Sequence, residues 1–346
     1  MSQQNRARAH AEPASAHLRA FMVEHPNAGP MHLSRLPLFA LAVAAAATPL
    51  AAQTLTPYDV FAFQNFTLNN TEVNGTLAVG GNATLSSFAV GRFLNAGYPD
   101  YSLVVGNNLT TNAGQIYAGK TYVGGTVNTT LTSFPPGKSP ENSGPSPINF
   151  ALESARLTGI SDTYAAMAPT GTTVLTNGEL KFIGGSDFNV FNVPISLLQS
   201  GTAGYEFVTP TNARNIVNVI GSSDQSAFNN TAFYFNCTDV NTSASCETGS
   251  NENTPYAAAF TLFNFNQQTN VDFGGPVHGS ILAPNADATF GYGDVVGTVV
   301  VKNAYANAEF YSNRDFGVMP TPEPATLGLM ATGLVGVIGM ARRRKR

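Results

Sequence analysis

The sequence predicts a mainly β protein, a β-solenoid or β-helix-like stack of short strands with one flanking α-helix. Short segments with alternating apolar residues recur at 69–91, 102–128 and 277–312, and Asn-Gly, Gly-Gly or Gly-Asn pairs separate them. Only one central stretch has apolar residues at helical spacing. Charged residues make up 11% of the chain, against about 25% in an average domain, and Asn, Thr, Ser and Gly replace them.

The strands predict stacked coils because they are short and closely spaced. Gly and Asn tolerate the positive φ that tight corners need, and Val, Leu and Ala at alternate positions would form the core. Further strands are predicted at 173–175, 180–183, 188–193, 216–220 and 258–265. No strict repeat length holds along the chain, so a β-sandwich is the alternative architecture.

The single helix is predicted between Pro147 and Pro169, after a Pro-, Ser- and Gly-rich loop at 135–147. We expect it to cover one side or end of the strands, where it would also protect a sheet edge. Its apolar positions are Ile148, Leu152, Ala155, Ile160, Tyr164 and Met167.

The C-terminal end has three parts in a fixed order. Pro322-Glu323-Pro324 precede an uncharged apolar run at 325–341, and a basic cluster closes the chain. A helix of these 17 residues spans about 26 Å, just short of a bilayer core, so we predict a marginal transmembrane helix. Basic residues stay on the cytoplasmic side and act as a membrane stop. The stop is formed by Arg342, Arg343, Arg344, Lys345 and Arg346.

This order resembles the PEP-CTERM sorting signal of bacterial exported proteins. The resemblance implies an exosortase, a membrane protease-transpeptidase, as a partner, with cleavage at or near Pro322–Pro324. The alternative is an ordinary C-terminal membrane anchor.

Four regions are expected along the chain. Residues 1–30 are expected to be either a wrongly assigned start of the gene or a disordered extension. The reason is that Met31 begins a secretory signal peptide at 31–52, with Arg35 before its apolar run. Residues 53–318 form one extracellular β domain, and residues 319–346 form the sorting signal. The protein is therefore expected to be exported, held in the membrane at least transiently by its tail, and then displayed at the cell surface or released.

Charge and cysteine content narrow the class of protein. Residues 53–319 contain 8 Lys and Arg against 18 Asp and Glu, giving 8 − 18 = −10, which argues against nucleic acid as a partner. The two cysteines, Cys237 and Cys246, lie in a polar stretch that would be outside the cell. A local disulfide is expected there, with two free thiols as the alternative.

The exported part is similar to the choice-of-anchor A domain. The similarity rests on residues 58–68, 73–83, 189–193 and 279–287, the last of which contains Ala-Pro-Asn-Ala-Asp. It implies a surface or matrix protein, and it offers no catalytic residues to transfer.

No catalytic residues are predicted. His278 is the one histidine after residue 52, and no nucleophile motif surrounds it, so we expect it to face solvent or bond at a turn. Asp272 with Asp287, or Asp287 with Asp294, could form a glycosidase pair, although solvated turn residues are the simpler interpretation. No metal ligand can be named, but a structural Ca²⁺ would suit the acidic exterior. The Thr-rich run at 129–132 is too short to predict a face that binds ice or sugar.

The sequence thus predicts an exported surface or extracellular-matrix protein of a bacterium, adhesive or structural and not an enzyme. Exposed Tyr, Phe and Asn on one face would contact exopolysaccharide or a matrix protein. The alternatives are a carbohydrate-active enzyme and a calcium-dependent polysaccharide-binding protein of the matrix.

Overall fold

The computed structural model describes residues 55–199, 203–221, 225–229, 232–250, 253–311 and 316, all within one compact unit. The extension at 1–30, the signal peptide at 31–52 and the sorting signal at 319–346, with its helix at 325–341, lie outside the described residues. Among the helices that are described, none is long and apolar enough to cross a membrane.

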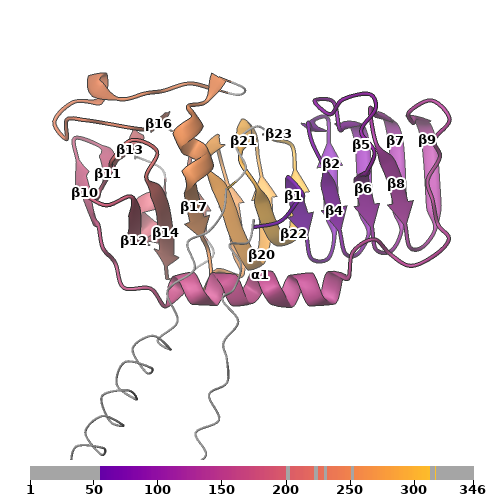
Figure 1. Ribbon diagram of the computed structural model, residues 1–346, viewed down its shortest axis with the longest axis horizontal. Coiled ribbons are helices and arrows are strands. Elements are labelled where there is room, and N and C mark those ends of the chain that lie inside the picture. Colours follow the sequence, from indigo (N-terminus) through magenta and orange to yellow (C-terminus); the bar gives the residue numbers. More distant parts are fainter. Residues whose placement is uncertain are drawn as a thin grey trace, which may run out of the picture. The chain divides into compact units, whose positions relative to one another are not determined.

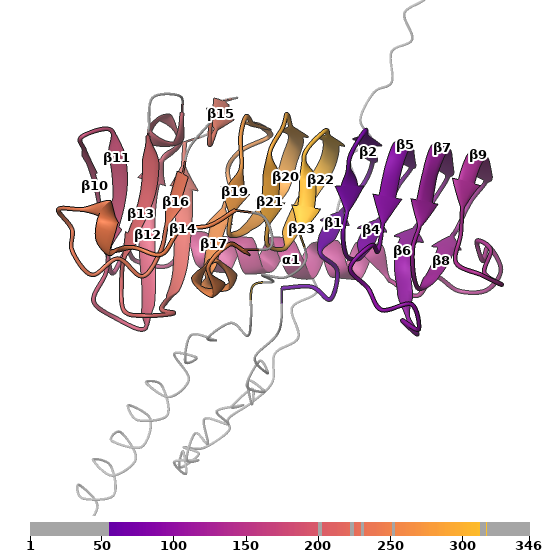
Figure 2. The ribbon, with the colours of Figure 1, turned by 90° about the horizontal axis from the view of Figure 1, so that it is seen from above.

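The described chain winds through three-sided coils, and each side of the stack is a ladder of strands (Figures 1 and 2). We call the sides face A, face B and face C. Face A is the parallel ladder β8 (Lys120–Val123), β6 (Tyr101–Val105), β4 (Leu77–Val79), β1 (Val60–Ala62), β22 (Val299–Ala306), β20 (Ser280–Phe290), β17 (Thr261–Asn264), β14 (Arg214–Ile220) and β12 (Phe188–Pro194).

Face B is also parallel throughout, and the second halves of β20 and β22 belong to it. Its order is β9 (Val127–Ser133), β7 (Leu109–Ile116), β5 (Ala83–Val90), β2 (Phe66–Asn69), β22, β20, β18 (Asn270–Phe273) and β15 (Gln225–Ala227). Face C is β19 (Val277–His278), β21 (Asp294–Val296), β23 (Glu309–Tyr311), β3 (Glu72–Val73) and the end of β5.

A separate four-stranded sheet contains an antiparallel pair of strands, β10 with β11. Its order is β10 (Thr172–Thr176), β11 (Glu179–Ile183), β13 (Gly204–Val208) and β16 (Ala232–Tyr234). Short 3-10 turns are η1 (Ile195–Leu198), η2 (Ser243–Ser245) and η4 (Tyr256–Phe260). The predicted strand at 258–265 is therefore wrong in its first three residues, which belong to η4. The parallel ladders confirm the mainly β, β-helix-like prediction and do not match a β-sandwich of antiparallel sheets.

The coils are not stacked in the order of the sequence. From the middle of the stack the chain builds coils up to β9 at one end, and α1 (Phe150–Ala165) then carries it back toward the other end. From β10 the coils return to the middle, where β22 pairs with β1 and β23 with β3 (Figure 1). Leu55 and Phe316, near the two limits of the described chain, therefore share one apolar cluster.

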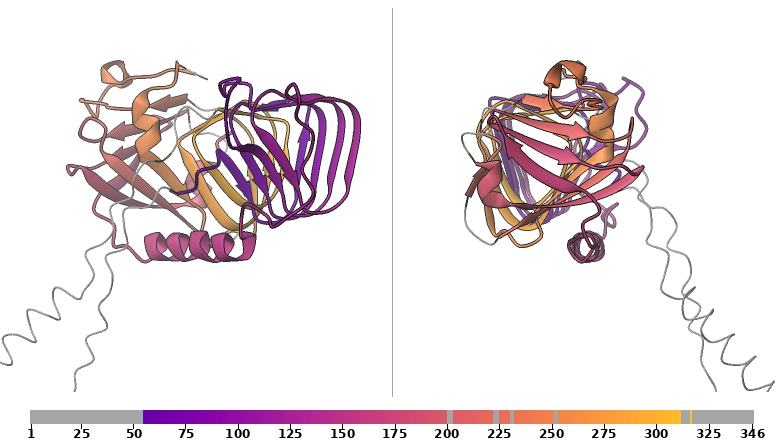
Figure 3. Two further views of the ribbon diagram at one scale, coloured as in Figure 1. Left: turned by 45° about the vertical axis from the view of Figure 1, so that its right-hand side comes forward. Right: turned by 90° about the vertical axis from the view of Figure 1, so that its left-hand side faces the viewer.

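Helix α1 covers the outer side of face A (Figure 3). Its buried residues are Leu157, Ser161 and Tyr164. Leu157 and Tyr164 share an apolar cluster with outward side chains of face A such as Phe61 and Ile216, and Ser161 donates a hydrogen bond to the Asn264 side-chain oxygen at 2.6 Å. Face A is thus largely apolar on both sides, as parallel strands covered on both sides generally are, and Asn218 and Asn264 on it are buried and bond the helix.

Two details of the helix prediction are wrong. Leu152 is 68% exposed and Ala155 is exposed, because the buried stripe runs through Leu157, Ser161 and Tyr164, one to two positions away on the helix. The helix covers a face, and it protects no sheet edge. Asn149 begins it, and the side chain of this residue accepts a hydrogen bond from the Leu152 N–H at 3.1 Å.

Corners between the faces depend on close approach between coils. A Cβ added to Gly106 would lie 2.3 Å from the Gly80 carbonyl oxygen of the next coil, so this position requires glycine. The corner between faces B and C instead places Asn70, Ser87, Ala113 and Leu131 at φ of 48–54°. The expectation of Gly or Asn at corners is therefore too narrow, because stacking between coils imposes this conformation on other residues as well.

Candidate functional site

Face B presents a row of polar side chains that come from eight strands. Residues at equivalent positions lie in register across the ladder, about 4.8 Å apart from strand to strand. Thr67 on β2, for example, pairs with Thr84 on one side and with Tyr305 on the other. In order from β9 to β15 the row is Asn128, Thr110, Thr84, Thr67, Tyr305, Thr289, Asp272 and Ser226.

A ladder of asparagines fixes the edge of face B next to this row. The side-chain oxygen of Asn303 accepts from the Asn65 backbone N–H at 2.8 Å, and that of Asn65 accepts from Asn82 N–H at 3.1 Å. Asn108 continues the pattern and accepts from the Thr126 N–H at 2.9 Å. Each coil thus bonds the next through a side chain, which holds the polar row in a fixed position.

One half of face B is hollowed. The hollow has a volume of about 630 Å³ and lies over β15, β18, β20 and β22. Tyr305 is 47% exposed in it. Its lining residues are Asn65, Ser226, Asn270, Val271, Asp272, Asp287, Ala288, Thr289, Asn303, Ala304 and Tyr305.

Two carboxylates lie in the hollow. Asp287 accepts from the Asn303 amide at 2.7 Å and lies 3.4 Å from the Lys302 ammonium. Asp272 lies on the neighbouring strand β18, two residues after Asn270, which pairs with Asp287. The hollow therefore combines acceptors, amide donors, hydroxyls and one aromatic ring, a set that can bond and stack on a hydroxylated ligand.

The structure brings together only one of the two carboxylate pairs considered from the sequence. Asp272 and Asp287 share the hollow, whereas Asp294 lies on β21 of face C. Asp294 is bonded to His278, whose Nε2 lies 3.2 Å from its carboxylate.

Of the two expectations for His278, exposure to solvent is wrong; the residue is hydrogen-bonded, to Asp294, but from strand β19 and not from a turn. It is 4% exposed, and its ring stacks on Phe233 with a centroid distance of 5.2 Å. Ser280, the nearby hydroxyl, is fully buried and accepts from the Thr298 N–H at 3.0 Å. The three groups are packed into the fold and do not form an accessible nucleophilic site.

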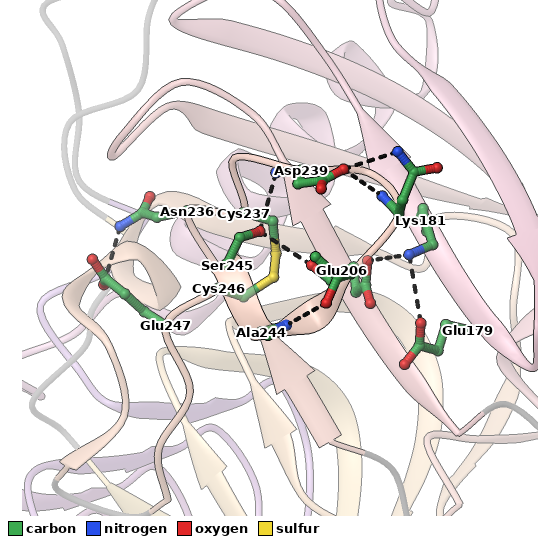
Figure 4. The surroundings of a disulfide bond; sticks show 12 residues. Glu179, Lys181, Glu206, Asn236, Cys237, Asp239, Ala244, Ser245, Cys246 and Glu247 are labelled. Atoms are coloured by element: carbon green, nitrogen blue, oxygen red, sulfur yellow. Dashed lines mark hydrogen bonds and ion pairs between the residues drawn. A yellow bond between two sulfur atoms is a disulfide. The ribbon is translucent and has the colours of Figure 1, made fainter.

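The cysteines lie over a buried ion pair (Figure 4). Cys237 and Cys246 form a disulfide with an S–S distance of 2.03 Å. Beneath this loop Lys181, 2% exposed, bonds Glu206, which is fully buried. The Glu206 carboxylate lies near both sulfurs, but these are joined to each other and are not thiolate ligands for a metal.

A second pair of carboxylates meets where the first and last coils join. Burial, and then the neighbouring Glu309, raise the pKa of Glu72, which also bonds Arg92 at 2.6 Å. Asn74 donates to Glu309 at 2.7 Å. The cluster has its own cation in Arg92, so it gives no ligand set for the structural Ca²⁺ that the sequence left open.

Two family models match the chain. The model of the family described as "Putative Ice-binding-like adhesive domain" matches residues 51–312. The chain belongs to this adhesive-domain family. The PEP-CTERM protein-sorting motif matches residues 320–345, which include Pro322, Glu323 and Pro324 and most of the basic cluster. Both resemblances read from the sequence are thereby confirmed.

Solved structures give one further likeness. A glycosylated ice-binding protein from an Arctic yeast is 15% identical, with a TM-score of 0.28, over 79% of this chain and 96% of the other. None of the curated proteins matches the chain.

The polar row was missed in the sequence because its members are far apart in the chain. Thr67, Thr84 and Thr110 stand in three different strands and form a row only when the coils stack. The Thr run at 129–132 lies on β9, which contributes only Asn128, at one end of the row. Thr84 and Thr110 each stand three residues after a Gly-Gly or Gly-Asn pair, a signal that could have found part of the row.

Proposed function

We propose that this adhesive-domain protein binds a hydroxyl-rich polysaccharide in the hollow of face B. The observation that carries the proposal is the hollow itself, where Asp272, Asp287 and Asn303 lie beside the exposed ring of Tyr305. The membership in an adhesive family and the sorting motif support a binding role at the cell surface.

The chemistry of the hollow favours a neutral or amino sugar over a uronic acid. Carboxylates accept hydrogen bonds from sugar hydroxyls, and the amide of Asn65 supplies a donor. The nearby cation Lys302 is already paired with Asp287, so an anionic polymer would meet net negative charge. The strands fix these groups in place, which lowers the entropy lost on binding.

Binding to purified exopolysaccharide tests the proposal, for example by affinity electrophoresis of the mature protein. Tyr305→Ala should weaken binding roughly tenfold, since a central aromatic contact contributes about 1.4 kcal/mol or more. Asp272→Ala should weaken it similarly. Tyr256→Ala is the matched control, because Tyr256 is 60% exposed and lies outside the hollow. Equal binding by wild type and both hollow variants would contradict the proposal.

Sorting by an exosortase completes the proposed function. The signal peptide would export the chain, the helix at 325–341 would hold it in the membrane, and cleavage near Pro322–Pro324 would release the domain to the surface or matrix. The proposed function is binding without catalysis, and it requires no cofactor.

A second candidate function is ice binding, which the other half of face B favours. There Thr67, Thr84 and Thr110 form a regular row of hydroxyl and methyl groups in consecutive strands. Thr84→Tyr would disrupt the regular row and should abolish thermal hysteresis if the domain binds ice. Thr172→Tyr, at an exposed position of β10, is the control. Wild-type protein without thermal hysteresis would exclude this candidate.

A further inference from the structure

Strand β9 is the last strand at one end of face B. It pairs with β7 on one edge, and no described strand pairs with its other edge. Its backbone therefore offers hydrogen-bonding groups to a further strand.

The inward side of β9 is exposed, although Phe134 just after it packs against the core. Val127 is 36% exposed, whereas Leu109, the equivalent residue of the preceding coil, is 1% exposed. Thr129 is exposed, although its equivalent Thr111 is 2% exposed. Leu131 is 81% exposed. An additional coil over β9 would bury these side chains as β7 buries those of β5.

Both ends of face A are partly covered by other segments of the described chain. On face A, Glu141 pairs with the last strand β8, and its carbonyl accepts from the Val123 N–H at 2.8 Å. At the opposite end of the stack, the chain entering β10 crosses the last strand of face A, where the Gly171 N–H bonds the Val190 carbonyl at 3.1 Å. Face B has no such covering segment at β9 in the described chain, although β10 of the four-stranded sheet is also an edge strand, paired only with β11 there.

The devices that usually keep edge strands apart are missing from β9. No Asp, Glu, Lys or Arg occurs between Thr121 and Gly137, and no Pro lies within the strand. Residues 53–319 carry a net charge of 8 − 18 = −10, so two copies repel each other over most of their surface. Strand β9 itself carries no charge, so that repulsion is weak along it.

We propose that β9 pairs with β9 of a second copy of this chain, in a two-fold, end-to-end dimer. A coil end of the same cross-section is the surface that matches this opening in shape. The two-fold axis runs the paired strands antiparallel and places Val127 and Thr129 of each copy against those of its partner. A two-fold contact uses the β9 edge of both copies, so pairing through β9 stops at two copies. The dimer would present two copies of face B, and it does not depend on what face B binds.

Molecular mass in solution tests the dimer, measured by light scattering after size exclusion over a range of concentrations. The mature protein should have twice its monomer mass. Thr129→Lys should halve that mass, because the two-fold axis sets like charges against each other. Thr110→Lys, at an exposed position of β7 within the stack, should remain dimeric. A monomeric wild type, a dimeric Thr129→Lys protein, or species larger than a dimer would each overturn the proposal.

Crosslinking provides a measurement that does not depend on weakening the interface. Asn128→Cys places a thiol on β9, and the native cysteines are already bonded to each other. Mild oxidation should yield a covalent dimer, whereas the same substitution at Thr84, inside the stack, should not. Failure of Asn128→Cys to crosslink while Thr84→Cys does so would refute pairing through β9.

Discussion

Replacing Lys181 by methionine should destabilise the domain strongly. Lys181 is 2% exposed and its partner Glu206 is fully buried, so solvent screens neither charge. One oxygen of the Glu206 carboxylate already has no hydrogen-bond partner among the described residues. Without Lys181 the buried carboxylate would lose the hydrogen bond and the main charge that compensate its burial.

The expected cost is about 3–5 kcal/mol, the usual penalty for removing one partner of a buried ion pair. Urea unfolding at neutral pH, followed by circular dichroism, measures the loss as a lower midpoint. The double variant Lys181→Met with Glu206→Leu should recover much of the stability, because two apolar side chains replace the pair. Arg92→Met is a control, since its ion pair with Glu72 is exposed on the arginine side.

The pH dependence of the variant has a defined sign. Burial raises the pKa of Glu206 above its ordinary value, and the loss of Lys181 raises it further. A carboxyl whose folded pKa is raised contributes stability that is fully present below the unfolded value of about 4.3 and is lost as pH rises through the folded value. Lys181→Met should therefore regain stability on acidification from neutral pH. A variant as stable as wild type at neutral pH, or a double variant no better than the single one, would refute this reasoning.

Three further predictions concern the coils, the disulfide and the ends of the chain. Gly106→Val should lower stability by about 1–3 kcal/mol in thermal unfolding, because its Cβ would meet the Gly80 carbonyl at 2.3 Å; Gly97→Val, with open space around it, should be neutral. Reduction of Cys237–Cys246 should cost about 2–3 kcal/mol, and an unchanged unfolding midpoint with reductant would argue against this. Intact-mass spectrometry of protein from cells should show loss of residues 1–52 and of Arg342–Arg346; an intact basic tail would instead indicate a plain anchor.

Local features were largely determined by the sequence. Alternation of apolar residues identified most strands, and Pro147, Pro169 and the apolar spacing between them identified the single helix. The three-part C-terminal pattern was recognisable without structure, because each part is contiguous and acts through its own composition. These predictions succeeded because each depends on interactions within a few residues.

Tertiary structure alone decided how the coils meet. Asn65 bonds Asn303, a residue 238 positions away, because the last coil of the chain stacks on the first. Coil lengths vary, so no repeat in the sequence specifies which coil stacks on which, and hydrogen bonding between parallel strands together with burial of the shared core sets the register. That stacking produces the polar row, the hollow around Tyr305 and the open edge at β9. No single stretch of sequence could therefore predict them.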